Sequence, residues 1–367
     1  MVQRSVKILA APMAFVLGST AMTSAAIAQS EEGFSWYGFL NGGVISVDDG
    51  TSTTTEVVDN SNAPSRLGFW FNNDLANGTI KFNFETALGL PGSSSRSQTS
   101  GGGDIEWSQE NLRKVELIYQ TDNVGTFYVG QGSMASDGIT GGTDFSGTGL
   151  VGTVAVSDTF GGFEFLTGGV GSGVSIGDVF KDFDGGRKGR VRYDSPNFNG
   201  FVISAAAGQE ILKDDNSDRF YDVALRYGTD FGDTSFKGTL AYAVNDLSSG
   251  ETKTVIGSIG ALHNPTGISG TLSVGENDQS GSYVYGKVGY QQQWFSFGKT
   301  YLSADVFRSQ DMVATGDEGV VWGLEAVQKV DSANVELFAA YRSHSYEQTG
   351  TNFSDVDGYM IGARWSF

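Results

Sequence analysis

Apolar and polar residues alternate along most of the chain after residue 33. In the segment 80–88, Ile80 and Phe82 alternate with Lys81 and Asn83. Because side chains of a β-strand point alternately to its two faces, each such segment predicts a strand with one apolar and one polar face. The pattern predicts sixteen strands, at residues 34–47, 65–72, 80–88, 112–120, 126–131, 188–194, 201–207, 221–227, 236–242, 252–262, 266–275, 282–290, 297–308, 320–330, 335–344 and 357–367.

The last segment, 357–367, is the most informative. Tyr359, Ile361 and Trp365 share one face, and the chain ends on Phe367. An edge strand of an ordinary β-sandwich is one interpretation. A strand whose apolar face meets lipid is the other, because membrane barrels carry aromatic residues at both membrane interfaces.

The connections between the segments favour a closed barrel. Short turns rich in Asn, Asp and Gly alternate with long polar connections. A β-propeller or a repeat adhesin would show a fixed sequence period, and none is found. Lipid requires that every backbone polar group be paired, so the strands must close on themselves. We therefore expect an all-β fold, a 16-stranded antiparallel transmembrane β-barrel, with its short turns facing the periplasm.

Composition narrows the class. The chain has 53 Gly, 5 Pro, 25 Phe and no Cys, and 39% of its residues are hydrophobic. Many strands and tight turns explain the glycine and aromatic content, and the hydrophobic share is too low for a helical membrane protein. The formal net charge of −19 argues against binding to nucleic acid, which needs a basic surface.

The amino-terminal residues have the pattern of an export signal. Arg4 and Lys7 precede an apolar stretch, and Ala26-Ile-Ala28 fits a small-x-small cleavage site. We expect residues 1–28 to be a signal peptide and residues 29–367 to be the mature barrel.

Several segments are shared with a known family. They are Trp36-Tyr-Gly38, Ser65-Arg-Leu-Gly-Phe69, Val124-Gly-Thr-Phe-Tyr-Val-Gly-Gln131, Arg190-Val-Arg-Tyr-Asp-Ser-Pro-Asn-Phe-Asn-Gly200 and the ending Gly362-Ala-Arg-Trp-Ser-Phe367. In this order the chain resembles the general porins of Gram-negative bacteria, most of all the alphaproteobacterial type.

The resemblance implies a homotrimer in the outer membrane, surrounded by lipid and lipopolysaccharide, with a water-filled channel for ions and small hydrophilic solutes in each protomer. It also implies that the third loop, about 132–187, folds inward and narrows the channel. Gly362, Trp365 and Phe367 would belong to the signal that the barrel assembly machinery reads.

Basic residues on the polar faces are candidates for the channel wall. Arg66 matches the family's wall arginine and lies on the polar face of its strand. On the next basic strand the motif selects Arg113 while the alternation selects Lys114, and a local bulge would reconcile the two. The family's lysine on the first strand is replaced by Phe39. Three more basic residues lie on one face of the strand expected at 188–194 and form a row there: Lys188, Arg190 and Arg192.

Acidic residues early in the third loop are the expected partners of this basic wall. Asp137 and Asp144 are the candidates. The alternative is that both are turn-forming residues of a Gly-rich loop. Opposed charges across a narrow pore would bias its ion selectivity.

Other functions find less support. A solute-selective porin, for a sugar or an anion, stays open because Tyr283, Tyr285, Tyr301 and Phe307 could line the lumen. An outer-membrane enzyme would need a histidine beside a nucleophile. His263 lies in an expected turn and His344 near an expected strand end, which favours ordinary polar positions over a catalytic role. A surface adhesin is the third alternative. We expect no cofactor; acidic loop segments such as 182–186 suggest at most a divalent cation bound weakly in a loop.

Overall fold

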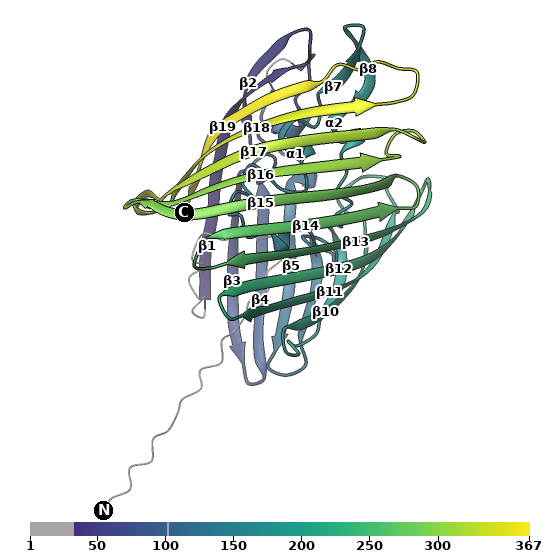
Figure 1. Cartoon of the computed structure of the whole chain (residues 1–367). Helices are drawn as coiled ribbons and strands as arrows, with labels where there is room; N and C mark the ends of the chain where they lie inside the picture. The colour runs from purple at the N-terminus through teal and green to yellow at the C-terminus, as the bar shows by residue number, and fades with distance from the viewer. Residues whose placement is uncertain (1–32, 101–102) are drawn as a thin grey trace, which may run out of the picture.

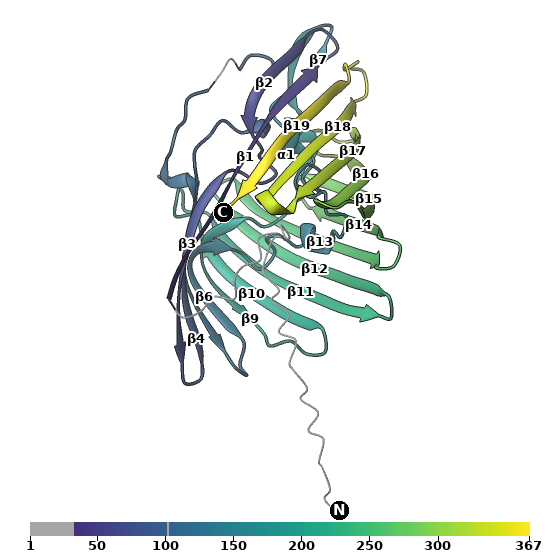
Figure 2. The same ribbon diagram turned by 90° about the vertical axis from the view of Figure 1, so that its left-hand side faces the viewer.

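A computed structural model describes residues 33–100 and 103–367, so the predicted signal peptide lies outside the described residues. Sixteen strands form a closed antiparallel wall, which confirms the predicted barrel. Their order is β1, β3 to β6 and β9 to β19, and β19 pairs with β1 to close the circle. Figures 1 and 2 show the strands tilted around a common interior.

The wall strands mostly extend the predicted segments by a few residues. Their bounds are β1 (Gly33–Asp48), β3 (Arg66–Leu75), β4 (Gly78–Ala87), β5 (Leu112–Thr121), β6 (Thr126–Ser133), β9 (Arg187–Asp194), β10 (Phe201–Gln209), β11 (Arg219–Phe231), β12 (Thr234–Leu247), β13 (Gly250–His263), β14 (Ile268–Asn277), β15 (Gly281–Phe295), β16 (Gly298–Gln310), β17 (Glu318–Val330), β18 (Val335–Glu347) and β19 (Val356–Ser366).

Alternation along each strand separates the outside of the wall from its inside. On β14, Leu272 and Val274 are about half exposed, whereas Thr271 and Ser273 are buried. The exposed apolar residues face outward and the polar residues face the lumen. This arrangement suits a barrel whose outer surface is covered by lipid.

The two ends of the chain meet at the seam between β1 and β19. Residues 39–48 of β1 pair with residues 357–366 of β19. Beyond the last strand residue, the Phe367 amide donates to the Gly38 oxygen at 3.0 Å, and the Gly38 amide donates to the Phe367 oxygen at 3.1 Å. Trp365 and Phe367 point outward and lie against each other, with ring centroids 5.3 Å apart. Gly362 contributes to the seam because a side chain there would meet the backbone of Gly42 and the ring of Phe338.

The two ends of the barrel differ. We call the end that carries Phe367 the base and the opposite end the mouth. The base has short connections throughout, for example 76–77 and 232–233. The mouth carries the long connections 88–111 and 134–186, but two of its connections, 248–249 and 278–280, are as short as those of the base. The predicted alternation of short and long connections therefore fails on this side of the barrel.

Four further pieces of structure lie at the mouth or inside the barrel. Strand β2 (Thr53–Asp59) pairs with the half of β1 that is nearer the mouth. It lies between two predicted strands, in a segment expected to be a loop. A two-stranded sheet, β7 (Glu164–Thr167) with β8 (Val170–Ser175), and the helices α1 (Ser157–Phe160) and α2 (Ile176–Val179) belong to the connection 134–186. The single-turn 3₁₀ helices are η1 (Ser93–Ser95), η2 (Gln109–Asn111), η3 (Gly141–Thr143) and η4 (Asp331–Ala333).

Within residues 33–100 and 103–367, no helix has the length and apolar character needed to cross a membrane.

Substitution at the seam provides a test of closure. We expect Gly362→Val to lower stability by about 1–3 kcal/mol, because the added methyl groups must displace backbone and a packed ring. The measurement is the midpoint of urea-induced unfolding in detergent micelles. Gly286→Val is the matched control, since a side chain at Gly286 meets nothing within 4 Å. Equal midpoints for the two variants would contradict this account of the seam.

Candidate functional site

The connection 134–186, here called loop 3, runs through the interior of the barrel. Its hydroxyl groups bond to inward-facing residues of several wall strands. The Ser136 hydroxyl donates to Asp222 on β11 at 2.5 Å, the Thr143 and Ser258 hydroxyls are 2.5 Å apart, and the Thr148 and Ser303 hydroxyls are 2.6 Å apart. The polar inner face of the wall thus holds the loop at many points.

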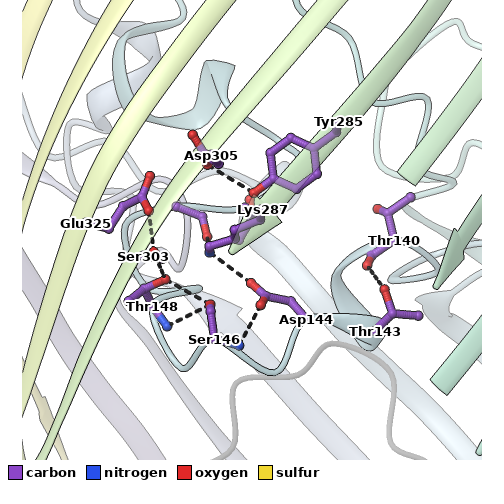
Figure 3. A network of polar contacts seen from close by, with 12 residues as sticks. Thr140, Thr143, Asp144, Ser146, Thr148, Tyr285, Lys287, Ser303, Asp305 and Glu325 are labelled. Carbon is purple, nitrogen blue, oxygen red and sulfur yellow. Dashed lines mark hydrogen bonds and ion pairs between the residues drawn. The ribbon is translucent and has the colours of Figure 1, made fainter. Parts of the chain in front are cut away.

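An ion pair fixes the middle of loop 3 to β15. The Lys287 ammonium lies 3.0 Å from an Asp144 carboxylate oxygen and donates to the Gly152 carbonyl at 2.5 Å (Figure 3). Lys287 is 4% exposed. Asp144, expected on the acidic side of the pore, is therefore an anchor of the loop, and its partner Lys287 was not singled out from the sequence.

Behind this anchor lies a buried charge network that the sequence analysis missed. The Arg342 guanidinium contacts both Asp305 oxygens, at 3.1 and 2.9 Å, and Glu325 at 3.3 Å. The Tyr285 hydroxyl donates to Asp305 at 3.0 Å. All three charged side chains have no exposed surface. They stabilise the wall beneath the loop and do not meet the water of the channel.

Apolar packing fills the part of the lumen next to β1 and β15 to β19. Phe160, Phe163 and Phe180 of loop 3 are almost completely buried and belong to one core cluster with wall residues. Its larger wall members include Ile45, Tyr283, Tyr285, Phe307, Val321 and Met360, and the cluster extends along β10 to β13 through Ala206, Ala224, Ala241 and Ile256. In both views of the fold α1 lies within the outline of the strands (Figures 1 and 2). The charged residues predicted for the channel wall lie on other strands, β3, β5 and β9.

The first part of the remaining wall carries two arginines on one carboxylate. Arg66 and Arg113 contact the same Glu85 oxygen, at 3.3 and 2.7 Å. The pairing of β4 with β5 shifts register next to Glu85, so that Lys114 lies opposite Glu85 and Leu112 opposite Thr86. Arg113 is thus the extra residue of a bulge. The bulge lets Arg113 and Lys114 both face the lumen, although they are adjacent in the sequence.

The most exposed cations of this wall lie on β5 and β9. Lys114, Arg187 and Lys188 keep about a fifth of their side-chain surface exposed. Arg187 lies 3.8 Å from Asp137 of loop 3, and Lys188 lies 2.7 Å from Glu210 at the mouth. Arg187 was not singled out from the sequence, because it lies where the loop joins the strand.

Arg190 and Arg192 also face inward, but both are buried. Arg190 bonds to Glu116, and Arg192 bonds to Asp194 at 2.8 and 2.9 Å. Both donate to the Ser133 carbonyl, at 3.1 and 3.3 Å, where loop 3 begins. In this structure the two arginines hold the junction of strand and loop, and the exposed basic surface is formed by their neighbours.

Loop 3 presents carboxylates toward this basic wall. Burial raises the pKa of Asp137, but Arg187, Arg113 and Lys114 together outweigh burial and hold it below its ordinary value. Burial and the neighbouring Asp182 raise the pKa of Asp158 to about 7, against an opposing effect of Arg113. Burial, Asp182 and Asp137 raise the pKa of Asp184 well above its ordinary value.

The acidic edge of loop 3 therefore consists of Asp137, Asp158, Asp182 and Asp184, and only the first of them was a candidate from the sequence. The loop brings these residues together from turns and from α1, and no alternation marks them. Within the described ranges, no three His, Asp or Glu residues are arranged to hold a metal ion.

Fixed cations that face fixed carboxylates, inside a barrel with an apolar exterior, are typical of a channel that crosses a membrane. The family model of the Gram-negative porins matches residues 13–366, and the chain belongs to this family. It lies in the outer membrane and forms a channel there. A search of curated proteins finds no match.

Solved structures share the fold at low sequence identity. An anion-selective porin from Comamonas acidovorans is 17% identical, covers 92% of this chain and 100% of its own, and has a TM-score of 0.61. OprB of Pseudomonas putida is 10% identical, covers 91% and 94%, and also has a TM-score of 0.61. The trimer form of OmpT, an outer membrane protein of Vibrio cholerae, is 16% identical, covers 91% and 99%, and has a TM-score of 0.56.

The acidic edge should make ion selectivity depend on pH near neutrality. Because the pKa of Asp158 is about 7, lowering the pH from about 8 to about 6 protonates this carboxyl and removes a negative charge from the pore. We expect the zero-current potential in a salt gradient to move toward anion preference over this range. Asp158→Asn should flatten the dependence, whereas Asp104→Asn, in an exposed mouth loop, should retain it. An unchanged profile in Asp158→Asn would contradict the assignment.

Proposed function

We propose that the protein is a passive diffusion channel for ions and small hydrophilic solutes, sorting them by size and by the field across its narrow part. The observation that carries this proposal is the partly exposed basic wall of Arg66, Arg113 and Arg187, which faces the acidic edge of loop 3. Opposed fixed charges order water and favour polar over apolar solutes.

The histidines support a channel without catalysis. His344 has no exposed surface, and its ring lies 6.0 Å from that of Phe160 and 5.7 Å from that of Phe180. The Val356 carbonyl oxygen lies 3.0 Å from the His344 Nδ1 and accepts a hydrogen bond from this nitrogen. His263 forms its side-chain contact with Thr266 in a base turn. Neither histidine lies beside a nucleophile in an accessible cleft, as an outer-membrane hydrolase would need.

A sugar channel with an aromatic slide finds little support. Tyr283, Tyr285 and Phe307 do face inward, as the alternation predicts, but they are at most 2% exposed beneath loop 3. Tyr301 alone of the four candidates keeps part of its surface exposed. These four residues therefore do not form a row of accessible aromatic faces.

Under this proposal the protein forms a homotrimer, and lipid and lipopolysaccharide surround the trimer. The trimer form of the Vibrio cholerae protein supports the oligomeric state. The outward-facing Trp365 and Phe367 suit a terminal segment that is read by the assembly machinery before the seam closes. An export signal at residues 1–28 is part of the same proposal.

Permeation of uncharged solutes tests the proposal directly. Liposomes that contain the purified protein should swell in small neutral sugars, at rates that fall as sugar size increases. Planar bilayers should show stepwise conductance that does not depend on a particular solute. Bilayers that stay insulating, or swelling limited to one sugar, would refute a non-specific channel.

Release of the loop anchor should widen the path. Lys287→Met removes the bonds to Asp144 and Gly152, so residues 144–152 lose their charged attachment to β15. We expect a larger single-channel conductance and a higher size limit for neutral sugars, by about 1.5-fold or more, because loop position sets the pore width. Lys253→Met is the control, since Lys253 is exposed on the outer face. Equal conductance in the two variants would show that the anchor does not position the loop.

A further inference from the structure

A set of cations lies on the inner face of the wall near the base, beside and below loop 3. Each is within three residues of the base end of its strand and shares the parity of inward-facing neighbours. We call this set the basal ring: Lys81 on β4, Lys237 on β12, Lys299 on β16, Lys329 on β17 and Arg364 on β19.

The basal ring surrounds the lumen. In the order of the wall, β4 and β12 are six strands apart, β12 and β16 are four apart, and β16 and β4 are six apart around the seam. Lys81, Lys237 and Lys299 therefore approach the lumen from three sides. A solute that leaves loop 3 toward the base must pass between them.

Within the described ranges, none of these three lysines has a carboxylate within 4 Å, although Asp74 acts on Lys81 and Asp144 acts on Lys237 from a greater distance. Lys81 donates to the Gln120 side-chain oxygen at 3.0 Å, and Lys299 donates to the Gln291 side-chain oxygen at 3.2 Å. The Lys237 ammonium lies 4.8 Å from the centre of the Phe145 ring of loop 3. Amide and ring contacts hold an ammonium group in place without cancelling its charge.

The other two members share one acid. Arg364 bonds to Glu336, its Nε at 2.7 Å, and Lys329 lies 3.9 Å from the same carboxylate. The Lys329 and Lys299 ammonium groups lie 5.6 and 5.8 Å from the centre of the Tyr301 ring. Two cations on one carboxylate leave a net positive charge, so this side of the ring is also basic.

The remaining acids near the base do not neutralise the ring. Asp74 and Asp230 lie exposed at strand ends and form no ion pair within 4 Å with any member of it, so the interaction of Asp74 with Lys81 passes through water. Asp122, Asp233 and Asp331 are exposed on the turns. Exposed charges in water are screened over about 8 Å at physiological salt, whereas the partly buried lysines act on solutes inside the lumen.

From this geometry we propose that the basal ring is a second selectivity element, a shallow binding zone for small oxyanions that carry more than one negative charge, such as inorganic phosphate or di- and tricarboxylates. The proposal rests on the channel function and adds a solute class to it. Three ammonium groups around one path attract a multiply charged anion more strongly than chloride, because each negative charge adds its own interaction with each cation.

The test compares charge-neutral and charge-retaining variants in planar bilayers. Lys81→Gln/Lys237→Gln/Lys299→Gln should lower the permeability of phosphate relative to potassium by about 3-fold or more, and that of chloride by less. Lys81→Arg/Lys237→Arg/Lys299→Arg should retain the wild-type ratio. The matched control removes three basic residues from the mouth loops and outer face, Lys213→Gln/Lys253→Gln/Arg308→Gln, and should leave the ratio unchanged.

Chemical modification provides a second readout on folded protein. The chain has no cysteine, so Lys237→Cys introduces a single thiol. A thiol reagent that adds a quaternary ammonium should restore phosphate permeability, and one that adds a sulfonate should reduce it further.

Two results would overturn the inference: equal shifts in the ring and control variants, or reagents of opposite charge with the same effect. Failure of the wild-type protein to conduct in any salt would instead refute the channel function.

Discussion

Complete pairing of the backbone around the wall is the constraint on which the rest of the structure depends. Inside a bilayer an unpaired amide or carbonyl has no water to bond, so the sheet has to end on itself. The seam of β1 with β19 meets this requirement to the last residue, where Gly38 and Phe367 exchange two backbone hydrogen bonds. Gly362 lets the strands approach at this seam. Closure then leaves one face of every strand for lipid and the other for the lumen.

The lumen is divided into two regions with different chemistry. Next to β1 and β15 to β19, loop 3 brings Phe160, Phe163 and Phe180 into a buried apolar core. On the other side the wall keeps charged groups in contact with water. The buried pair of Arg342 with Asp305 belongs to the first region, and the partly exposed Arg66 and Arg113 belong to the second. The loop thus creates the pore by filling the rest of the barrel.

Charge is distributed unevenly between the inside and outside of the molecule. The whole chain carries a formal charge of −19, yet Lys81, Lys237 and Lys299 face the lumen without a carboxylate in direct contact. Net charge therefore describes the loops and turns that meet bulk water, where salt screens it. Inside the barrel a solute meets the cations of the wall and the carboxylates of loop 3, so the net charge of the chain does not describe the field in the pore.

The sequence by itself determined the class, the number of wall strands and the direction in which Arg66 and Lys188 point, because period-two alternation reports which face of a strand meets lipid. The sequence left open whether Arg113 or Lys114 faces the lumen. The bulge beside Glu85 lets both side chains face it. Strand β2 was missed because pairing with β1, rather than local pattern, makes it a strand.

Only the tertiary structure decided what the charged residues do. Asp144 meets Lys287 across a separation of 143 residues, and Asp158 joins Asp182 on one edge of loop 3. Such pairings follow from the path of a loop that has no periodic pattern, so alternation carries no information about them. Whether an inward-facing charge is exposed to water or buried beneath the loop is likewise set by that path.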